Sequence, residues 1–177
     1  MISAIVYASN SGYTAQYAKM LGEATGLPVN DISQMHNPQP DQQVIYLGWV
    51  MADKCVGARK AMKFFDVRAM VRVGMGPGSK AAADALHDQL LRDFGKEVDC
   101  FALQGGFDIK KLHGPFKWIM KVKCRDILKN LEEKKPLNEA QQLTYDMAKK
   151  GASAVSAGAL APVVEWYKAH KLSLIHI

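Results

Sequence analysis

The chain has 177 residues and a mass of 19.5 kDa, with 49% hydrophobic and 23% charged residues. This length suits one domain with a sizeable core, and the composition excludes a disordered, collagen-like or low-complexity chain. The three cysteines, Cys55, Cys100 and Cys124, lie far apart without a CxxC pair, which argues against a disulfide framework or a zinc site. We therefore expect a reducing, cytoplasmic location, and no signal peptide because the chain begins with a strand-like run. The longest nearly apolar run, 151–164, is too short to span a bilayer.

The net charge of +6 is confined to one segment. Residues 110–135 contain nine basic and three acidic residues, whereas the rest of the chain has 14 of each sign. A local excess of this kind indicates a surface with a partner rather than a general property of the molecule.

Apolar runs alternate with helical patterns along the first hundred residues. Short runs rich in β-branched residues predict strands, and apolar residues spaced by three and four predict helices. Ser79 is expected to cap a helix and Gly26 to end one. The expected strands cover 2–7, 27–32, 44–48, 67–73 and 98–103, and the expected helices cover 13–25, 56–65 and 79–94.

This alternation predicts an α/β fold, a three-layer sandwich around a five-stranded, doubly wound parallel sheet of order 2-1-3-4-5. Residues 1–170 are expected to form one domain. After a basic segment of helical character, one long helix is predicted from Asn138 to about Tyr167, bent or ended near Pro162. Residues 171–177 do not continue its periodicity and are interpreted as a frayed or artefactual tail. Ligands of such sheets bind at the carboxyl ends of the strands.

The loop after the first strand carries the most informative motif. Hydroxyl, amide and backbone N–H donors gathered at a helix N-terminus form a nest for a phosphate. The loop lacks the lysine of a Walker A sequence and the GxGxxG spacing, so we expect a monophosphate held by neutral donors. A simple capping turn is the alternative. The six residues are Ser9, Asn10, Ser11, Gly12, Tyr13 and Thr14.

The pattern Ser9-x-Ser11-Gly12-x-Thr14 directly after an N-terminal strand resembles the phosphate loop of flavodoxins, (Ser/Thr)-x-(Ser/Thr)-Gly-x-Thr. The order of strands and helices extends the resemblance over most of the chain. Short flavodoxin-domain proteins, including the flavodoxin-type protoporphyrinogen dehydrogenase, are the most similar. They share a Gly-rich turn, here 104–107, and an aromatic and basic stretch, here 116–121. Unlike electron-carrier flavodoxins, this chain is basic.

The resemblance implies non-covalent FMN, with its phosphate on residues 9–14. Its ring is expected between two loops, where Trp49 would stack on it and Met51 and Met75 would pack against its apolar edge. A core or rim position for Trp49 and gap-filling methionines are the alternatives, and Cys55 is interpreted as a buried residue rather than a redox thiol. The two loops contain Gly48, Trp49, Val50, Met51, Ala52, Gly74, Met75, Gly76, Pro77 and Gly78.

The basic segment 110–135 is the second informative feature. A basic amphipathic helix with an exposed aromatic suits an anionic membrane surface or an acidic partner, and an ordinary covering helix with solvated lysines is the alternative. No nucleic-acid motif accompanies the charge, so no nucleic-acid partner is expected. The candidate docking residues are Lys117, Trp118, Lys121 and Arg125. One broad apolar face is expected to hold Phe116, Ile119, Met120, Lys123, Ile127 and Leu131.

The leading hypothesis is an FMN-binding protein that transfers electrons, as a carrier or as an accessory to a partner reductase. Its partner would be a redox protein or a small electron acceptor. The alternatives are a small FMN oxidoreductase acting on a tetrapyrrole and a flavodoxin-like binding subunit without cofactor. No catalytic side chain is assigned because the flavin would carry the chemistry. The five histidines are scattered, so no metal site is expected.

Overall fold

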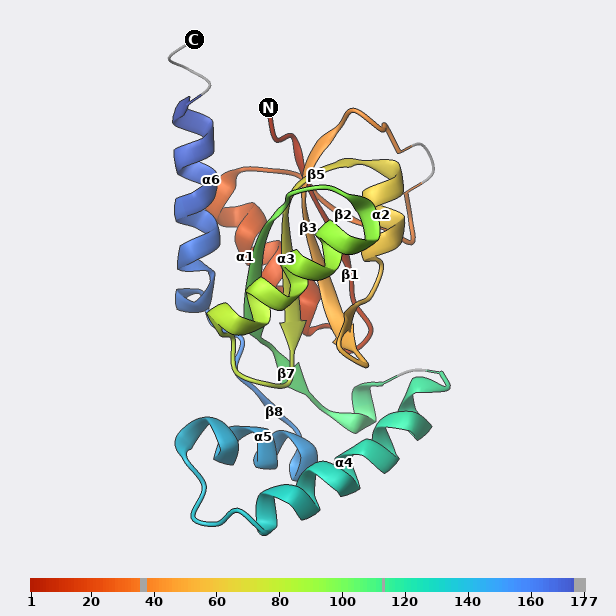
Figure 1. Ribbon diagram of the computed structural model, residues 1–177, viewed down its shortest axis with the longest axis vertical. Helices are drawn as coiled ribbons and strands as arrows, with labels where there is room; N and C mark the ends of the chain where they lie inside the picture. The colour runs from red at the N-terminus through yellow and green to blue at the C-terminus, as the bar shows by residue number, and fades with distance from the viewer. Residues whose placement is uncertain (36–37, 113, 174–177) are drawn as a thin grey trace.

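A parallel sheet with helices on both faces forms the centre of the molecule in the computed structural model (Figure 1), which describes residues 1–35, 38–112 and 114–173. The strands pair in the order β2-β1-β3-β5-β6, and every neighbouring pair is parallel. These five strands confirm the predicted three-layer sandwich of order 2-1-3-4-5 and the flavodoxin-like topology. Their bounds are β1 Ala4–Ala8, β2 Val29–Asp31, β3 Gln43–Met51, β5 Asp66–Gly74 and β6 Asp99–Gln104.

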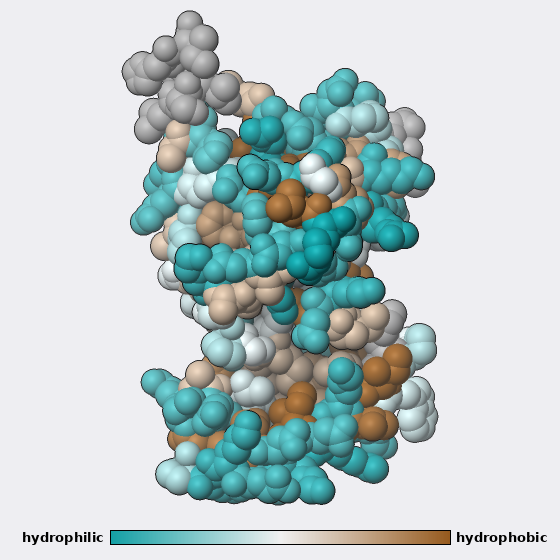
Figure 2. Space-filling model, viewed as in Figure 1, coloured by the Kyte–Doolittle hydropathy of each residue, from teal (hydrophilic) through white to brown (hydrophobic). Residues whose placement is uncertain are grey.

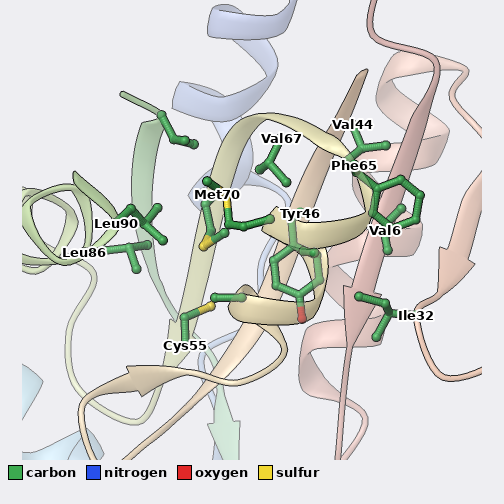
Figure 3. Packing of buried hydrophobic residues seen from close by; sticks show 14 of the residues in the cluster. Val6, Ile32, Val44, Tyr46, Cys55, Phe65, Val67, Met70, Leu86 and Leu90 are labelled. Atoms are coloured by element: carbon green, nitrogen blue, oxygen red, sulfur yellow. The ribbon is translucent and has the colours of Figure 1, made fainter. Parts of the chain in front are cut away.

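Two hydrophobic cores lie on opposite faces of the sheet, because successive strand residues point to opposite sides. In β3, Ile45 and Leu47 join the core under helices α1 and α6, whereas Val44 and Tyr46 join the core under α2 and α3. Figure 3 shows the second core, where the Tyr46 hydroxyl donates a hydrogen bond to the Val56 carbonyl at 2.7 Å. The helices are α1 Tyr13–Thr25, α2 Ala58–Phe64, α3 Lys80–Phe94 and α6 Ala161–Ser173.

Capping residues set the ends of these helices. The Ser79 hydroxyl accepts a hydrogen bond from the Ala82 N–H at 3.2 Å, as predicted for the start of α3. Gly26 ends α1 in the left-handed conformation, also as predicted. Helix α2 begins two residues later than expected, because Gly57 adopts a φ of 81° before it.

The prediction of a loop at 48–52 is wrong, because strand β3 continues through these residues as far as Met51. The strand then turns back into β4 (Lys54–Cys55), and Val50 pairs with Cys55 in an antiparallel ladder. Ala52 and Asp53 form the two-residue turn with φ of 48° and 61°, the signs that a primed hairpin turn requires. Neither residue is the glycine that usually marks such a turn, so the sequence pattern did not indicate the hairpin.

The single long helix expected from Asn138 to about Tyr167 is also wrong. Gly151, with a φ of 84°, ends α5, and the chain continues through a short strand and a 3-10 turn before α6. The strand β8 pairs with β7, a partner 46 residues earlier, which periodicity within one segment does not reveal. These elements are α5 Glu139–Lys150, β7 Gly106–Phe107, β8 Ala152–Ser153 and η2 Gly158–Leu160. Helix α6 includes 171–173 of the expected tail, and 174–177 lie outside the described residues.

Residues 106–153 form a helical unit beyond the carboxyl ends of the strands, joined to the sheet by β7 and β8 (Figure 1). It contains η1 (Ile109–Lys111), α4 (Phe116–Glu132) and α5. Its own core consists of four buried residues, with Met75 from the loop after β5 packed against them. The four buried residues are Phe107, Leu112, Cys124 and Met147.

The apolar face expected for α4 is partly wrong. Met120 packs against the core of the helical unit, and Cys124, which the expected face omitted, is buried in it. Ile119 and Lys123 are exposed instead, because the buried stripe follows positions 120 and 124 and leaves positions 119 and 123 at its edge. Ile127 and Leu131 are half-buried, and the side chain of Phe116 lies outside the described part of the structure.

Candidate functional site

The loop between β1 and α1 leads into a helix whose N-cap residue, Gly12, has no side chain with which to cap it. Gly12 occupies the N-cap position with a φ of 89°, and its N–H donates a hydrogen bond to the Ser9 hydroxyl at 3.1 Å. No described atom lies within 4 Å of the point where a Cβ on Gly12 would stand, so the loop opens onto free space. The first N–H groups of a helix have no intrahelical partners, and its N-terminus carries a partial positive charge, so this end of α1 suits an anion.

Thr14 adds a second hydroxyl-bearing residue to this end of α1, beside Ser11. It is 2% exposed and is the one buried polar residue in the described part of the chain. Together with Ser11 and Tyr13 it lines a small cavity of about 50 Å³ that reaches the ends of β3 and β5. A polar group is buried at a cavity wall most readily when it has a polar group to meet there.

A larger cavity of about 330 Å³ lies between the β3–β4 hairpin and the loop after β5. Helix α4 contributes Met120 and Lys123 to its wall. The two cavities adjoin, because four residues line both of them. These shared residues are Val50, Gly74, Met75 and Met120.

The structure brings most of the predicted cofactor residues together. Each of the following lines one or both cavities: Ser11, Tyr13, Thr14, Trp49, Val50, Met51, Ala52, Gly74, Met75, Gly76 and Pro77. Ser9, Asn10 and Gly12 form the loop in front of α1 without lining either cavity.

Two predicted glycines have other positions. Gly48 is buried in β3, where a Cβ would stand 2.5 Å from the Cys55 sulfur, so its hydrogen allows β4 to pack closely. Gly78 lines a third cavity, of about 580 Å³, beside the edge strand β6. Both glycines therefore serve chain packing and lie away from the site.

Trp49 lies within β3, paired with Val73, and lines the small cavity beside Ser11 and Thr14. The larger cavity has no aromatic residue among its described lining residues. Its apolar wall includes three methionines instead, Met51, Met75 and Met120. Methionine is flexible and polarisable, so these side chains can adapt to a flat aromatic ring.

Hydrogen bonds from α1 and β6 hold the loop after β5 in place. The Gln104 side-chain amide donates to the Met75 carbonyl at 2.9 Å, and the Gly105 N–H donates to the Gly74 carbonyl at 2.8 Å. The buried Tyr17 hydroxyl donates in turn to the Gln104 carbonyl at 2.7 Å. The wall of both cavities is therefore tied to the end of β6 and, through Tyr17, to α1.

Sequence reasoning missed several lining residues. Arg72 lines the larger cavity from within β5, and a charged residue inside an apolar strand pattern was the signal that could have found it. Leu112, Met120 and Lys123 come from the helical unit, and no local pattern places them near the strand ends.

The charged groups around the larger cavity are Arg72, Lys123 and Asp53, so its lining has a net positive charge. Arg72 is held by a hydrogen bond from its Nη1 to the Ala82 carbonyl at 3.4 Å. Cys55 is close to this region, but burial raises the pKa of its thiol to about 12, so the thiol is neutral at physiological pH. A neutral, buried thiol is a poor nucleophile, which favours the interpretation of Cys55 as a packing residue.

No protein-family model matches the chain, and no curated protein matches it. Among the described residues, no group of three or more metal-ligating side chains occurs. No described helix combines the length and the low charge that crossing a bilayer needs.

Proposed function

We propose that this chain binds FMN at the carboxyl ends of β1, β3 and β5 and transfers electrons. One observation carries the proposal: the N-terminus of α1 and two adjoining cavities converge where the strand order reverses between β1 and β3. Doubly wound sheets bind their ligands at this switch point.

The residues at the α1 end fit a phosphate. Ser11 and Thr14 supply neutral hydroxyl donors beside the N-terminus of α1, and the left-handed Gly12 leaves open space in front of it. Backbone N–H groups and the helix dipole would add to the hydroxyl hydrogen bonds. No carboxylate lies in the first turn of α1 to repel the dianion.

The larger cavity fits the ring of the cofactor. Gly74 and Gly76 bring backbone close to the cavity, while the three methionines supply its apolar wall. When bound, FMN would supply the redox chemistry, and the chain would bind it, orient it and exclude water. Arg72 and Lys123 would stabilise negative charge that develops on the ring.

A second candidate, a small FMN oxidoreductase, is favoured by the position of α4. An electron carrier exposes the edge of its flavin to a partner, whereas Met120 and Lys123 cover one side of the larger cavity. Arg72 and Lys123 would suit an anionic substrate such as a tetrapyrrole carboxylate. Turnover of such a substrate by the FMN-loaded protein, without a partner protein, would distinguish this candidate from a carrier.

Flavin titrations test the proposal directly. The purified protein, freed of any bound flavin, is titrated with FMN and with riboflavin, which lacks the phosphate. We expect FMN to bind at least about 100-fold more tightly, since hydrogen bonds to a charged group contribute about 1.5–3 kcal/mol each. Binding of neither flavin would contradict the proposal and support a cofactor-free binding subunit.

The variant Ser11→Asp sharpens the test. A carboxylate near a helix N-terminus favours folding, yet it would repel a phosphate bound there. We expect FMN affinity to fall about 100-fold or more, riboflavin affinity to stay unchanged, and the free energy of unfolding not to fall. Ser3→Asp, at an exposed serine before the amino end of β1 and so at the opposite edge of the sheet from the start of α1, is the matched control and should bind FMN like the wild type. If Ser11→Asp binds FMN with normal affinity, the phosphate does not bind at this loop.

A further inference from the structure

The outer face of α4 exposes an apolar patch. Trp118, Ile119 and Val122 are 74%, 50% and 61% exposed, and they account for three of the five large hydrophobic residues that are exposed in the described chain. The other two, Met1 and Leu91, lie on separate elements. The patch lies opposite the buried stripe of Met120 and Cys124, so folding of the chain leaves it uncovered.

Basic residues surround this patch. Six lysines and arginines and no carboxylate occur between Asp108 and Asp126. The Lys121 ammonium lies 5.6 Å from the centre of the Trp118 ring, so cation and aromatic ring share one surface. The exposed cations nearest the patch in sequence are Lys117, Lys121, Lys123 and Arg125.

Helix α4 lies at the end of the molecule away from the N-terminus and from α6 (Figure 1). Figure 2 shows apolar atoms on this end of the molecule, set among hydrophilic ones. Trp118, Ile119 and Val122 line none of the three cavities described above. The patch is therefore a protruding helix surface that a flat partner can reach without meeting the sheet.

We propose that the outer face of α4 binds the surface of an anionic lipid bilayer. A helix that lies in the membrane interface combines apolar and aromatic side chains on one face with lysine and arginine at its edges, and anionic headgroups supply the opposite charge. The long lysine side chains can extend along the apolar surface to reach the headgroups. A protein partner would more often insert an anchor into a pocket, which this protruding face does not offer.

Membrane binding would place the candidate site beside the bilayer. Met120 and Lys123, on other faces of the same helix, line the larger cavity. The surface and the cavity remain separate in their residues, because Trp118 and Val122 touch neither cavity of the site. The membrane proposal can therefore be tested without any flavin.

Flotation with lipid vesicles tests it on the full chain. One set of vesicles contains phosphatidylcholine alone, and in the other part of it is replaced by phosphatidylglycerol. We expect the protein to float with the anionic vesicles only and to be released by added salt, because screening weakens the attraction. Absence of binding to the anionic vesicles would overturn the proposal, as would equal binding to both sets.

Matched variants separate this face from general basicity. Each basic residue near a membrane surface contributes about fivefold in affinity, so Lys117→Gln with Lys121→Gln should weaken vesicle binding by about 25-fold. Lys96→Gln with Lys168→Gln removes the same charge from exposed positions elsewhere and should bind like the wild type. Trp118→Ala should weaken binding, whereas Leu91→Ala, at the exposed apolar position of α3, should not.

Three results would overturn the assignment of this face. If both pairs of lysine substitutions weaken vesicle binding equally, net charge alone accounts for the binding. If Trp118→Ala and Leu91→Ala weaken vesicle binding equally, the apolar patch does not contact the membrane. Salt-sensitive binding to immobilised polyglutamate without any binding to vesicles would assign the face to an acidic protein.

Discussion

Tyr13 shows how single residues from distant segments shape the site. A side chain at position 106 would overlap the Tyr13 ring. Because Gly106 has no side chain, the ring packs against the backbone there. The Lys111 ammonium lies 5.1 Å from the centre of the same ring. The ring is 6% exposed and forms part of the small cavity. Residues about a hundred positions later in the chain therefore hold a residue of the candidate phosphate loop in place.

Buried thiols make the stability of the protein sensitive to alkaline pH. Burial raises the pKa of Cys55 from its ordinary 9.0 to about 12, so the folded protein keeps a proton that the unfolded chain loses above pH 9. The free energy of unfolding is therefore expected to fall as pH rises from 9 toward 12, by up to about 1.4 kcal/mol per pH unit for each such group. Urea unfolding at a series of pH values measures this slope.

The variant Cys55→Ala isolates the contribution of one thiol. Its own stability at neutral pH will differ from that of the wild type, so the slope with pH is the quantity to compare. We expect a shallower fall above pH 9, while Cys100, whose pKa burial also raises to about 12, keeps part of it. An unchanged slope would show that the Cys55 thiol does not carry the effect.

At the scale of elements, the β3–β4 hairpin extends the sheet over the site. Met51, Ala52 and Asp53 reach the larger cavity only because β3 continues past Gly48 and turns back. The turn holds Ala52 at a φ of 48°, in the left-handed region that residues with a Cβ seldom adopt. Strained backbone is often retained at binding sites, and here it lies at the cavity wall.

Replacement of Ala52 by glycine should therefore stabilise the protein. The left-handed conformation disfavours alanine by about 1–2 kcal/mol, and the greater freedom of glycine in the unfolded chain offsets part of the gain. We expect the free energy of unfolding to rise by about 0.5–1 kcal/mol in a denaturant titration. Ala85→Gly, at an exposed position in the middle of α3, should instead lower it by a similar amount. If both variants lower the free energy of unfolding, the backbone at Ala52 is not strained.

At the scale of the whole molecule, the sheet and the helical unit differ in the size of their cores. The two cores of the sheet contain 15 and 14 buried residues, whereas the core of the helical unit contains four. A segment that buries little apolar surface opens locally at a lower free energy than the molecule unfolds. We therefore expect the helical unit to open more readily than the sheet.

Hydrogen exchange measures this difference. Backbone amides of α4 and α5 are expected to exchange faster than those of β3 and β5, at a neutral pH and low denaturant concentration. If FMN binds as proposed, its addition should slow exchange in α4, whose Met120 and Lys123 line the larger cavity. Equal protection of α4 and β3 in the flavin-free protein would show that the helical unit and the sheet open together.

The sequence alone determined the sheet and its strand order, and it singled out residues 9–14 as the candidate phosphate loop. These features depend on short-range patterns: buried β-branched runs, a helix that begins after Ser9–Gly12, and an alternation of strands and helices that leaves few topologies. The residues of β3 beyond Gly48 and the strand β8 escaped prediction because their pairing partners are set by the folded chain. A two-residue turn of Ala52 and Asp53 and the end of α5 at Gly151 carry only weak local signals.

Only the tertiary structure decided what closes the candidate site and which surface stays open. Met120, Lys123 and Leu112 meet the ends of β3 and β5 because the two-stranded link of β7 and β8 folds the helical unit against them. Periodicity showed that the segment after residue 115 is an amphipathic helix, but two apolar stripes compete in it. The stripe that contains Cys124 is buried in the core of the helical unit, and the stripe that contains Trp118 is exposed. Which stripe is buried depends on contacts between residues far apart in the sequence, so local periodicity does not predict it.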